Sequence, residues 1–412
     1  MHRRAIDEHR ANLVRDLKSA GRVRSAPVEA AFKTVPRHIF LPALPAAEAY
    51  RDCAHSIKSV DGIAVSSSSQ PAMMAEMLEQ LGAMPGERIL EIGAGSGYNA
   101  ALLAELVGPE GFVATVDIDD DIVRSARRNL DAAGFAAVVT LCDDGALGAP
   151  GYAPFDALIV TVAVGDVPPA WMRQVRIGGR IVVPLALGLA QRVIRFDRRA
   201  DSLLGTSVIG GEFVAFRGSS SAASIGAVSI LGDPGIRLRM LGNNQVDSSR
   251  LTRALHGQFV DTLVKPPLGP EELWGSLDLW LSVNEPGFCR LTAQGPAAES
   301  GRVPDAFGAG RAASHAIAAT LGVCVGSDLA VFAATERGMS VRSYGGVSRS
   351  SERLGRAIAN WDESGRPQNR DLEVTAMPRT PLAARTTLTV PGGALGAIVE
   401  TPSMDLLLRW TR

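Results

Sequence analysis

The stretch Leu90-Glu91-Ile92-Gly93-Ala94-Gly95-Ser96-Gly97-Tyr98-Asn99 joins an apolar run to a glycine-rich segment that precedes a helical pattern. Glycine has no Cβ, so the backbone can turn sharply at residues 93, 95 and 97 and a ligand can approach the main-chain N–H groups. A strand, a glycine loop and a helix in this order are typical of a fold that binds a nucleotide-like cofactor. The loop alone is weak evidence, because an ordinary strand-to-helix turn also uses glycine.

Acidic residues accompany the loop at the ends of successive apolar runs. Glu91 precedes the first glycine, Asp117 ends the run 111–117, and Asp144 follows the run 137–142. Asp117 lies where a ribose-binding carboxylate is expected, and Asp144 could accept a hydrogen bond from an adenine amino group. Because the carboxyl ends of parallel strands share one edge of a sheet, we expect these acids to surround one ligand.

The spacing of the glycines favours S-adenosylmethionine (SAM) over a dinucleotide. It is G-x-G-x-G, whereas a dinucleotide fold usually has G-x-G-x-x-G, and the nearby Glu91 suits the cationic amino-acid end of SAM. The residues that we expect to contact the cofactor are Ser66, Ser67, Ser68, Glu91, Gly93, Gly95, Ser96, Gly97, Asp117, Ile118, Asp144 and Gly145. The serine run could instead be a flexible loop.

Composition excludes several classes of function. The 412 residues carry 42 basic and 43 acidic side chains, so no electrostatic footprint for nucleic acid stands out. Four separated cysteines without C-x-x-C spacing predict a reduced cytoplasmic protein, and the six histidines show no ligand spacing, so we expect no metal. The first residues are charged, and no apolar run is long enough to cross a bilayer. The oligomeric state stays open.

Strands and helices alternate between residues 88 and 185, which predicts an α/β fold with a doubly wound parallel sheet. The runs 191–196, 203–209 and 212–216 are expected to add antiparallel strands at its edge. The glycine- and serine-rich residues 218–223 then predict a linker between a first domain, 1–217, and a C-terminal domain, 224–412.

The remaining segments are less regular. Prolines at 36, 42 and 45 predict an extended segment through Tyr50. Within 224–412 we expect a compact α+β domain, with strands at 277–283, 329–334, 372–376 and 387–390 and helices at 312–321 and 351–361.

Residues about 25–217 resemble the protein-L-isoaspartate O-methyltransferase family, whose fold is that of the class I SAM-dependent methyltransferases. The motifs that carry the resemblance are Val35-Pro36-Arg37-His38-Ile39-Phe40-Leu41-Pro42, Ala49-Tyr50-Arg51-Asp52, Ser69-Gln70-Pro71-Ala72-Met73 and Pro154-Phe155-Asp156-Ala157-Leu158-Ile159-Val160-Thr161. The resemblance places Ser69 on the family's active-site serine and implies a SAM-dependent carboxyl O-methyltransferase, with S-adenosyl-L-homocysteine as product.

Two departures from the family concern the substrate pocket. Val65-Ser66-Ser67-Ser68-Ser69 stands where the family has G-x-T-I-S, and Val162-Ala163-Val164 follows Thr161 where the family continues V-T-A-A. Cofactor use is therefore better supported than the repair substrate. Ser69 would orient the substrate carboxylate, and Thr161 would either hold the same group or be a buried hydroxyl that caps a strand end.

The long extension resembles enlarged family members that accompany ribosomally made peptides such as lanthipeptides, lasso peptides and graspetides. The segments 277–281 and 286–291 carry this second resemblance. It implies methylation of an aspartate in a precursor peptide, after which the ester closes to an aspartimide or opens to isoaspartate, with the C-terminal domain binding the peptide. The alternatives are repair of isoaspartyl sites in damaged proteins and a SAM-binding protein without catalysis.

Overall fold

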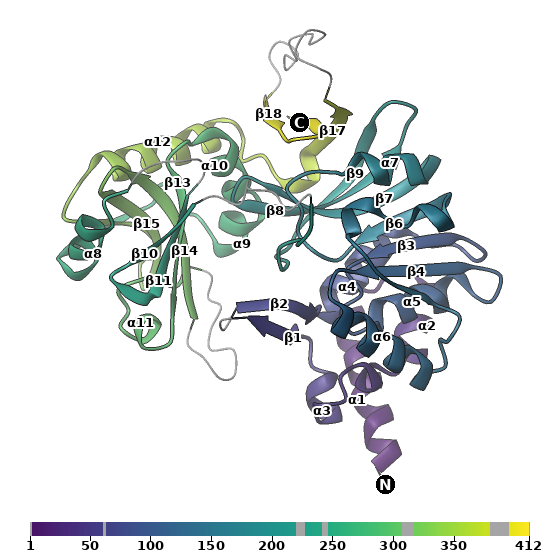
Figure 1. The fold of residues 1–412 in the computed structure, drawn as a ribbon. Helices are drawn as coiled ribbons and strands as arrows, with labels where there is room; N and C mark the ends of the chain where they lie inside the picture. The colour runs from purple at the N-terminus through teal and green to yellow at the C-terminus, as the bar shows by residue number, and fades with distance from the viewer. Residues whose placement is uncertain are drawn as a thin grey trace.

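The computed structural model describes residues 2–60, 63–219, 227–240, 246–306, 317–379 and 395–411, and they form two lobes (Figure 1). The first lobe contains residues 2–219 and the strands between 372 and 410, and the second lobe is built on residues 227–371. Residues 220–223 of the expected linker and the expected strand 387–390 lie outside the described residues.

The first lobe is built on a sheet with its parallel strands at one side. In sheet order, the parallel strands are β5 (Val139–Cys142), β4 (Phe112–Asp117), β3 (Arg88–Ile92), β6 (Phe155–Val160) and β7 (Val175–Leu187). Their residues are apolar in near-continuous runs because both faces of the sheet are covered. Ile89 and Ile159 pack on one face, whereas Leu90 and Leu158 pack on the other.

Helices cover both faces of this sheet (Figure 1). The helical elements of the lobe are α1 (His2–Ser19), α2 (Ala26–Thr34), η1 (Arg37–Phe40), α3 (Ala46–Ala49), α4 (Pro71–Leu81), α5 (Tyr98–Val107), α6 (Asp120–Ala132), η2 (Gly145–Leu147), η3 (Pro150–Tyr152) and α7 (Pro169–Gln174). The expected extended segment through Tyr50 is wrong, because η1 and α3 form there. Pro36 and Pro45 occupy the N-cap positions, since the φ of proline suits a helix start.

Antiparallel strands continue the first sheet beyond β7. They are β8 (Ala190–Arg198), β9 (Leu203–Gly210), β17 (Leu372–Pro378), β19 (Met404–Trp410) and β18 (Leu395–Glu400), in this order. The expected strand at 212–216 is wrong, since only Ala215 forms a bridge, to Ala163. β17 pairs with β9, so residues 224–412 are divided between two sheets and do not form one separate α+β domain.

The second lobe has an antiparallel sheet in the order β10, β11, β13, β14, β15, β16, β12. The strands are β10 (Ala227–Leu231), β11 (Asp233–Met240), β13 (Phe288–Gln294), β14 (Ile317–Val325), β15 (Asp328–Thr335), β16 (Gly338–Tyr344) and β12 (Phe259–Leu263), and the helical elements are α8 (Ser248–His256), α9 (Pro270–Glu272), η4 (Leu273–Leu277), α10 (Asp278–Asn284), α11 (Pro296–Glu299), α12 (Arg349–Glu363) and η5 (Asn369–Asp371). A small hairpin, β1 (His55–Val60) with β2 (Ile63–Ser68), belongs to the first lobe.

Two predictions for the second lobe are wrong. The run 277–283 is helical, because a short apolar run does not distinguish a buried helix from a strand. The described end of the expected helix 312–321 belongs to strand β14, and residues 312–316 lie outside the described residues.

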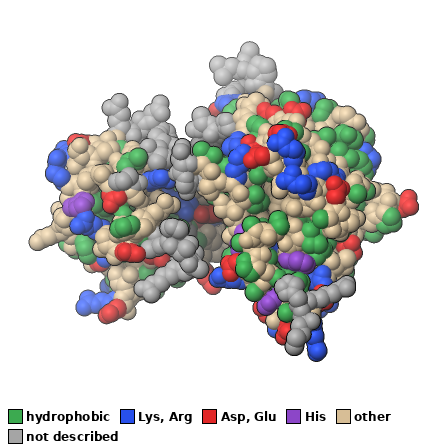
Figure 2. All heavy atoms as spheres, turned by 60° about the horizontal axis from the view of Figure 1, so that its bottom comes forward, with side chains coloured by type: hydrophobic (Ala, Val, Ile, Leu, Met, Phe, Trp, Pro, Cys, Tyr) green, Lys and Arg blue, Asp and Glu red, His purple; other side chains and the backbone are tan. Residues whose placement is uncertain are grey.

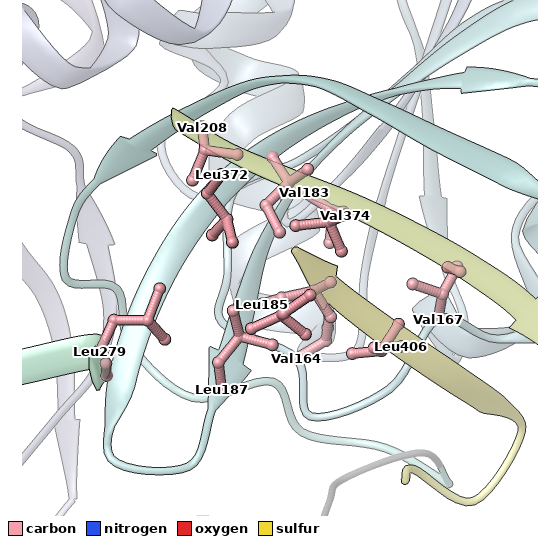
Figure 3. Close-up of a cluster of buried hydrophobic side chains, with 14 of the residues drawn as sticks. Val164, Val167, Val183, Leu185, Leu187, Val208, Leu279, Leu372, Val374 and Leu406 are labelled. Carbon is pink, nitrogen blue, oxygen red and sulfur yellow. The ribbon is translucent and has the colours of Figure 1, made fainter. Parts of the chain in front are cut away.

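One apolar core extends through both lobes. Figure 3 shows Val183 and Leu185 of β7 with Val374 of β17, Leu406 of β19 and Leu279 of α10. These side chains come from both halves of the chain, so the lobes do not have fully separate interiors. On the face in Figure 2, acidic and basic side chains are interspersed over both lobes. None of the helices in the described part of the chain combines the length and apolarity that a bilayer crossing requires.

A buried ion pair joins the lobes inside this core. The guanidinium of Arg192 on β8 donates to both carboxylate oxygens of Asp278 on α10, and its Nε donates to Asn369 Oδ1 at 2.8 Å. Burial raises the pKa of Asp278, although Arg192 opposes the change. The pair therefore stabilises the structure only while both partners remain.

Arg192→Met leaves Asp278 buried without its cation, so we expect it to lower the free energy of unfolding by about 3–5 kcal/mol. Chemical denaturation measures the change. Arg192→Met with Asp278→Leu should recover most of the loss, and Arg124→Met, which removes the exposed pair with Asp120, should cost less than about 1 kcal/mol. Equal losses in Arg192→Met and Arg124→Met would contradict the assigned role of the buried pair.

Candidate functional site

The site lies where the order of the parallel strands reverses. From β3 the chain continues through β4 to β5 on one side and then crosses to β6 on the other side of β3. The loops after β3 and β6 therefore diverge at the carboxyl ends of these strands and leave a crevice. This switch-point crevice encloses about 520 Å³ including its open mouth.

A second hollow of about 380 Å³ adjoins the crevice beside the serine run, and we call it the serine hollow. The expected residues that line the crevice are Ser66, Ser67, Gly93, Gly95, Asp117, Ile118, Gly145 and Thr161. Those that line the serine hollow are Ser67, Ser68, Ser69, Glu91, Gly93, Gly95, Ser96 and Thr161. The fold thus brings together all the expected residues except Gly97 and Asp144, which line neither space.

The glycines of the loop permit three different close approaches. Gly93 has φ +100°, and a Cβ there would lie 2.4 Å from Thr161 Oγ1. At Gly95, with φ +51°, a Cβ would lie 3.2 Å from the carbonyl oxygen of Ser67 on the hairpin. A Cβ on Gly97 would meet Ala126 on α6 at 3.2 Å. Gly93 and Gly95 therefore keep the crevice walls close together, whereas Gly97 lets α6 pack against the loop.

Asp117 presents a carboxylate to the crevice from the end of β4. Its Oδ2 accepts a hydrogen bond from the Gly95 N–H at 3.2 Å, and its Oδ1 accepts one from the Asp119 N–H at 3.3 Å. Burial raises the pKa of Asp117, and these two main-chain donors oppose the change. A half-buried carboxylate at a strand end can accept hydrogen bonds from the two hydroxyls of a ribose.

Glu91 is fully buried, and protein groups satisfy both its oxygens. Oε1 accepts from Asn99 Nδ2 at 2.8 Å, and Oε2 accepts from Thr115 Oγ1 at 2.6 Å. Burial raises the pKa of Glu91 to about 7, and the two hydrogen bonds oppose the change. This carboxyl group ties β3 to β4 and to the start of α5 while it lines the serine hollow.

Asp144 supports the loop after β5 with its carboxylate. Oδ1 accepts from the Ala146 N–H at 2.9 Å and Oδ2 from the Ser219 N–H at 2.7 Å. The end of the crevice near this loop is apolar, formed by Ile118, Gly145 and Phe216. A flat aromatic ring fits such a surface.

The serine run is a strand, because residues 63–68 form β2. Ser66 and Ser67 face the crevice, and Ser68 and Ser69 face the serine hollow. Ser68 Oγ and Tyr98 Oη are buried and have no hydrogen-bond partner among the described residues. Unpaired buried hydroxyls are costly, so a polar group of a ligand in the serine hollow would relieve both.

Thr161 joins the two sides of the switch point. Its hydroxyl lies 2.8 Å from the Gly93 carbonyl oxygen and 3.1 Å from that of Ile92, and it donates to these acceptors. Of the two readings left open by the sequence, this geometry favours a hydroxyl that caps a strand end.

Two supports of the site were not predicted from the sequence. Lys58 on the hairpin bonds to Asp121 at 2.9 Å and lies 3.1 Å from Asp119, and Arg217 also pairs with Asp119. Asp119 therefore binds both the hairpin, through Lys58, and the segment 214–217, through Arg217, and holds them over the crevice.

Arg37 is the second such support. It is fully buried and lies within a motif that the sequence singles out, but its role depends on segments distant in the chain. It donates to the Ser69 carbonyl oxygen at 3.0 Å and to that of Ala49 at 2.9 Å, and it lies 4.9 Å from the centre of the Tyr98 ring. Arg37 thereby fixes the main chain at Ser69.

The crevice and the serine hollow together fit SAM. Asp117 offers acceptors for a ribose, the apolar end offers a surface for an adenine ring, and the serine hollow offers hydroxyls for an amino-acid end. Gly93 and Gly95 leave space beside the loop that a Cβ on either residue would occupy. These residues are the ones that could hold the methyl donor expected from the sequence.

Comparison with known proteins gives matches over the first half of the chain. A protein-family model for protein-L-isoaspartate(D-aspartate) O-methyltransferase matches residues 8–220. Enzymes named protein-L-isoaspartate O-methyltransferase are similar to this chain in Thermotoga maritima (37% identity over 192 residues, 46% of this chain and 60% of that protein), Ignicoccus hospitalis (38% over 180 residues, 44% and 83%) and Methanopyrus kandleri (42% over 177 residues, 43% and 76%).

The solved structures include one named protein-L-isoaspartate O-methyltransferase, with a TM-score of 0.49 and 25% identity. The similarity covers 89% of this chain and 96% of that one. The chain spans 60% of the length of the Thermotoga relative, so not every part of that protein has a counterpart in the aligned region.

Gly93→Ala should disrupt the site more than a matched substitution elsewhere. Gly86 also has a positive φ, +81°, but nothing lies within 4 Å of a Cβ there, so Gly86→Ala should cost only the backbone strain of about 1–2 kcal/mol. Gly93→Ala should cost at least about 1 kcal/mol more because of the clash with Thr161 Oγ1, and it should weaken SAM binding at least tenfold. Denaturation and calorimetric titration measure both effects. Equal losses at the two glycines would refute the assigned contact.

Glu91 should make stability depend on pH. Its folded pKa of about 7 lies above the value of 4.5 that the unfolded chain has, so between these values only the folded state keeps the proton. Stability should therefore fall as the pH rises through this interval, by up to ~3 kcal/mol from this group.

Urea unfolding of the wild-type chain and of Glu91→Gln between pH 5 and pH 8 tests this dependence. Glutamine cannot titrate, so the difference in unfolding free energy between the two proteins should shift in favour of the variant as the pH rises. A difference that stays constant would show that the pKa of Glu91 is not raised.

Proposed function

The chain belongs to the protein-L-isoaspartate(D-aspartate) O-methyltransferase family, whose members transfer a methyl group from SAM to protein carboxyl groups, and from this premise we propose that it methylates a precursor peptide. The methylated group is the side chain of an aspartate. The ester then closes to an aspartimide when the following backbone nitrogen loses its proton and attacks the ester carbonyl carbon, with methanol as the leaving group, and water can open the ring to isoaspartate. The second lobe recognises the peptide.

The chemistry requires alignment more than proton transfer. SAM, when bound, supplies an electrophilic methyl group. A carboxylate has a reference pKa of about 4, so it is already the ionised nucleophile near neutral pH and needs no general base. The side chains of the site therefore orient the carboxylate oxygen and exclude water from it.

The hydroxyl groups of the serine hollow suit this task. Ser69, whose main chain is fixed by Arg37, would donate to the substrate carboxylate, and the unpaired hydroxyls of Ser68 and Tyr98 can donate to a carboxylate in the same space. Thr161 already donates to main-chain carbonyls, so its role is to hold the switch point and not to contact the substrate.

The observation that carries the choice of a peptide substrate is a cleft between the lobes. It encloses about 1110 Å³ including its mouth, and its walls come from both lobes, among them Arg192 and Gly210 of the first and Trp274 and Arg290 of the second. Gly210, Gly211 and Glu212 line this cleft, and residues 214–217 of the same segment line the switch-point crevice. A peptide bound in the cleft is thereby led toward the methyl donor.

The strand-addition mode expected from the sequence has a candidate on the second lobe. β12 is an edge strand, and all five of its residues are exposed, including Phe259, Val260 and Leu263. An exposed apolar edge strand can pair with an extended peptide. We propose that this edge holds a part of the precursor that lies away from the modified aspartate.

Repair of isoaspartyl sites is the second candidate function. The names of the relatives favour it, because the similar proteins from three organisms are called protein-L-isoaspartate O-methyltransferases. A repair enzyme must accept many sequences around the damaged residue, whereas a tailoring enzyme binds one peptide through an extended surface.

Labelled SAM distinguishes the two functions. The full-length protein is incubated with a generic isoaspartyl peptide or with a small aspartate-containing peptide encoded beside its gene. We expect a mass gain of one methyl group, or the loss of water that marks the aspartimide, in the neighbouring peptide alone. Transfer to the generic peptide with similar kcat/KM would support repair, and transfer to neither would contradict both functions.

A substitution in the cleft tests whether the peptide binds there. Trp274→Ala removes a large side chain from the wall of the cleft, so it should raise KM for the peptide at least tenfold and leave SAM affinity unchanged. Val347→Ala, at a residue that is 75% exposed and outside the cleft, serves as the control. Equal KM values for the two variants would remove the cleft from the proposal.

A further inference from the structure

A cluster of three side chains lies at the start of the β1–β2 hairpin, outside the crevice and the serine hollow. Its members are Glu48, Cys53 and His55. All three are half-buried, and their ligand-type atoms lie within 4.8 Å of one another. Cys53 Sγ lies 3.5 Å from His55 Nε2. Among the described residues, these three side chains are grouped closely enough to hold one metal ion.

We propose that Glu48, Cys53 and His55 bind a zinc ion. A thiolate, an imidazole and a carboxylate are the three ligand types of zinc sites in proteins, and three protein ligands leave a fourth position for water. The Zn–S and Zn–N distances of a tetrahedral site place the sulfur and nitrogen about 3.6 Å apart, which agrees with the observed 3.5 Å. The sequence-based expectation of no metal rested on spacing patterns, and these do not include C-x-H with a glutamate five residues earlier.

The surroundings of His55 agree with a metal ligand. A hydrogen bond joins its ring to the Glu48 backbone, which resembles the outer-shell contact that orients ligating histidines. Glu48 pairs with Arg51 at 3.1 Å, an exposed contact that a bound ion would replace at little cost.

The position of the cluster connects it to the candidate active site. Asp52, next to Cys53, accepts hydrogen bonds from Gln70 Nε2 at 3.0 Å and from the Ala72 N–H at 2.8 Å. Gln70 follows Ser69 directly. A zinc ion on Cys53 and His55 would fix the main chain at Asp52 and so hold the start of α4 and the main chain at Ser69 in place. The role of the ion is therefore structural: it stabilises the main chain that borders the serine hollow.

Metal titration of the full-length, chelator-treated protein tests the proposal. Cobalt(II) should bind one equivalent and give the visible absorption of a tetrahedral site together with a thiolate-to-cobalt charge-transfer band. Zinc(II) should displace cobalt, raise Tm and slow alkylation of Cys53. A protein that yields no tetrahedral cobalt spectrum would overturn the proposal.

Matched variants locate the site. Cys53→Ser and His55→Gln should abolish the charge-transfer band, and Glu48→Gln, at a surface side chain whose loss should not unfold the protein, should weaken binding at least tenfold. Cys142→Ser changes an exposed cysteine outside the cluster and should bind metal as the wild type does. Unchanged binding in Cys53→Ser and Glu48→Gln would place the metal elsewhere and refute the site. None of these measurements depends on methyl transfer.

Discussion

The contact between Thr161 and Gly93 is the constraint on which the site depends. The threonine hydroxyl occupies the place that a side chain at residue 93 would need, and it donates to the carbonyl oxygens at the end of β3. The loops that diverge after β3 and β6 are thereby joined just beyond the last paired residues of these two strands. The glycine loop is held in position by the protein itself, so a ligand meets a preformed surface and loses little free energy in ordering it.

Local patterns were sufficient for the central part of the fold. Strands β3 and β4 lie within the predicted alternation of strands and helices, because each is an apolar run between a turn signal and a polar end. The run around Leu279 and Trp280, predicted to be a strand, is a helix that buries Asp278 against Arg192. That partner lies 86 residues away in the chain, outside any local window of sequence.

The candidate site likewise contains residues that the sequence predicts and residues that it does not. Residues on adjacent strand ends, such as Asp117 and the glycines, follow from topology, since parallel strands present their carboxyl ends together. The contacts that support the site cannot be predicted from the topology. Arg37 reaches Ser69 across 32 positions and Arg217 reaches Asp119 across 98, and both contacts arise only after packing brings distant segments together. Asp144 lies at a strand end as expected, yet its carboxylate bonds to the main chain of the following turn.

The pairing of β17 with the first sheet affects how the chain folds during its synthesis. β9 has its inner partner, β8, as soon as residue 210 is synthesised, but its outer partner begins at Leu372. During translation β9 is therefore an open sheet edge while the whole second lobe is added, and pairing must close a long loop. A ribosome-bound chain that ends before β17 would carry this unpaired edge, and chaperones that shield exposed strands would be needed most during that interval.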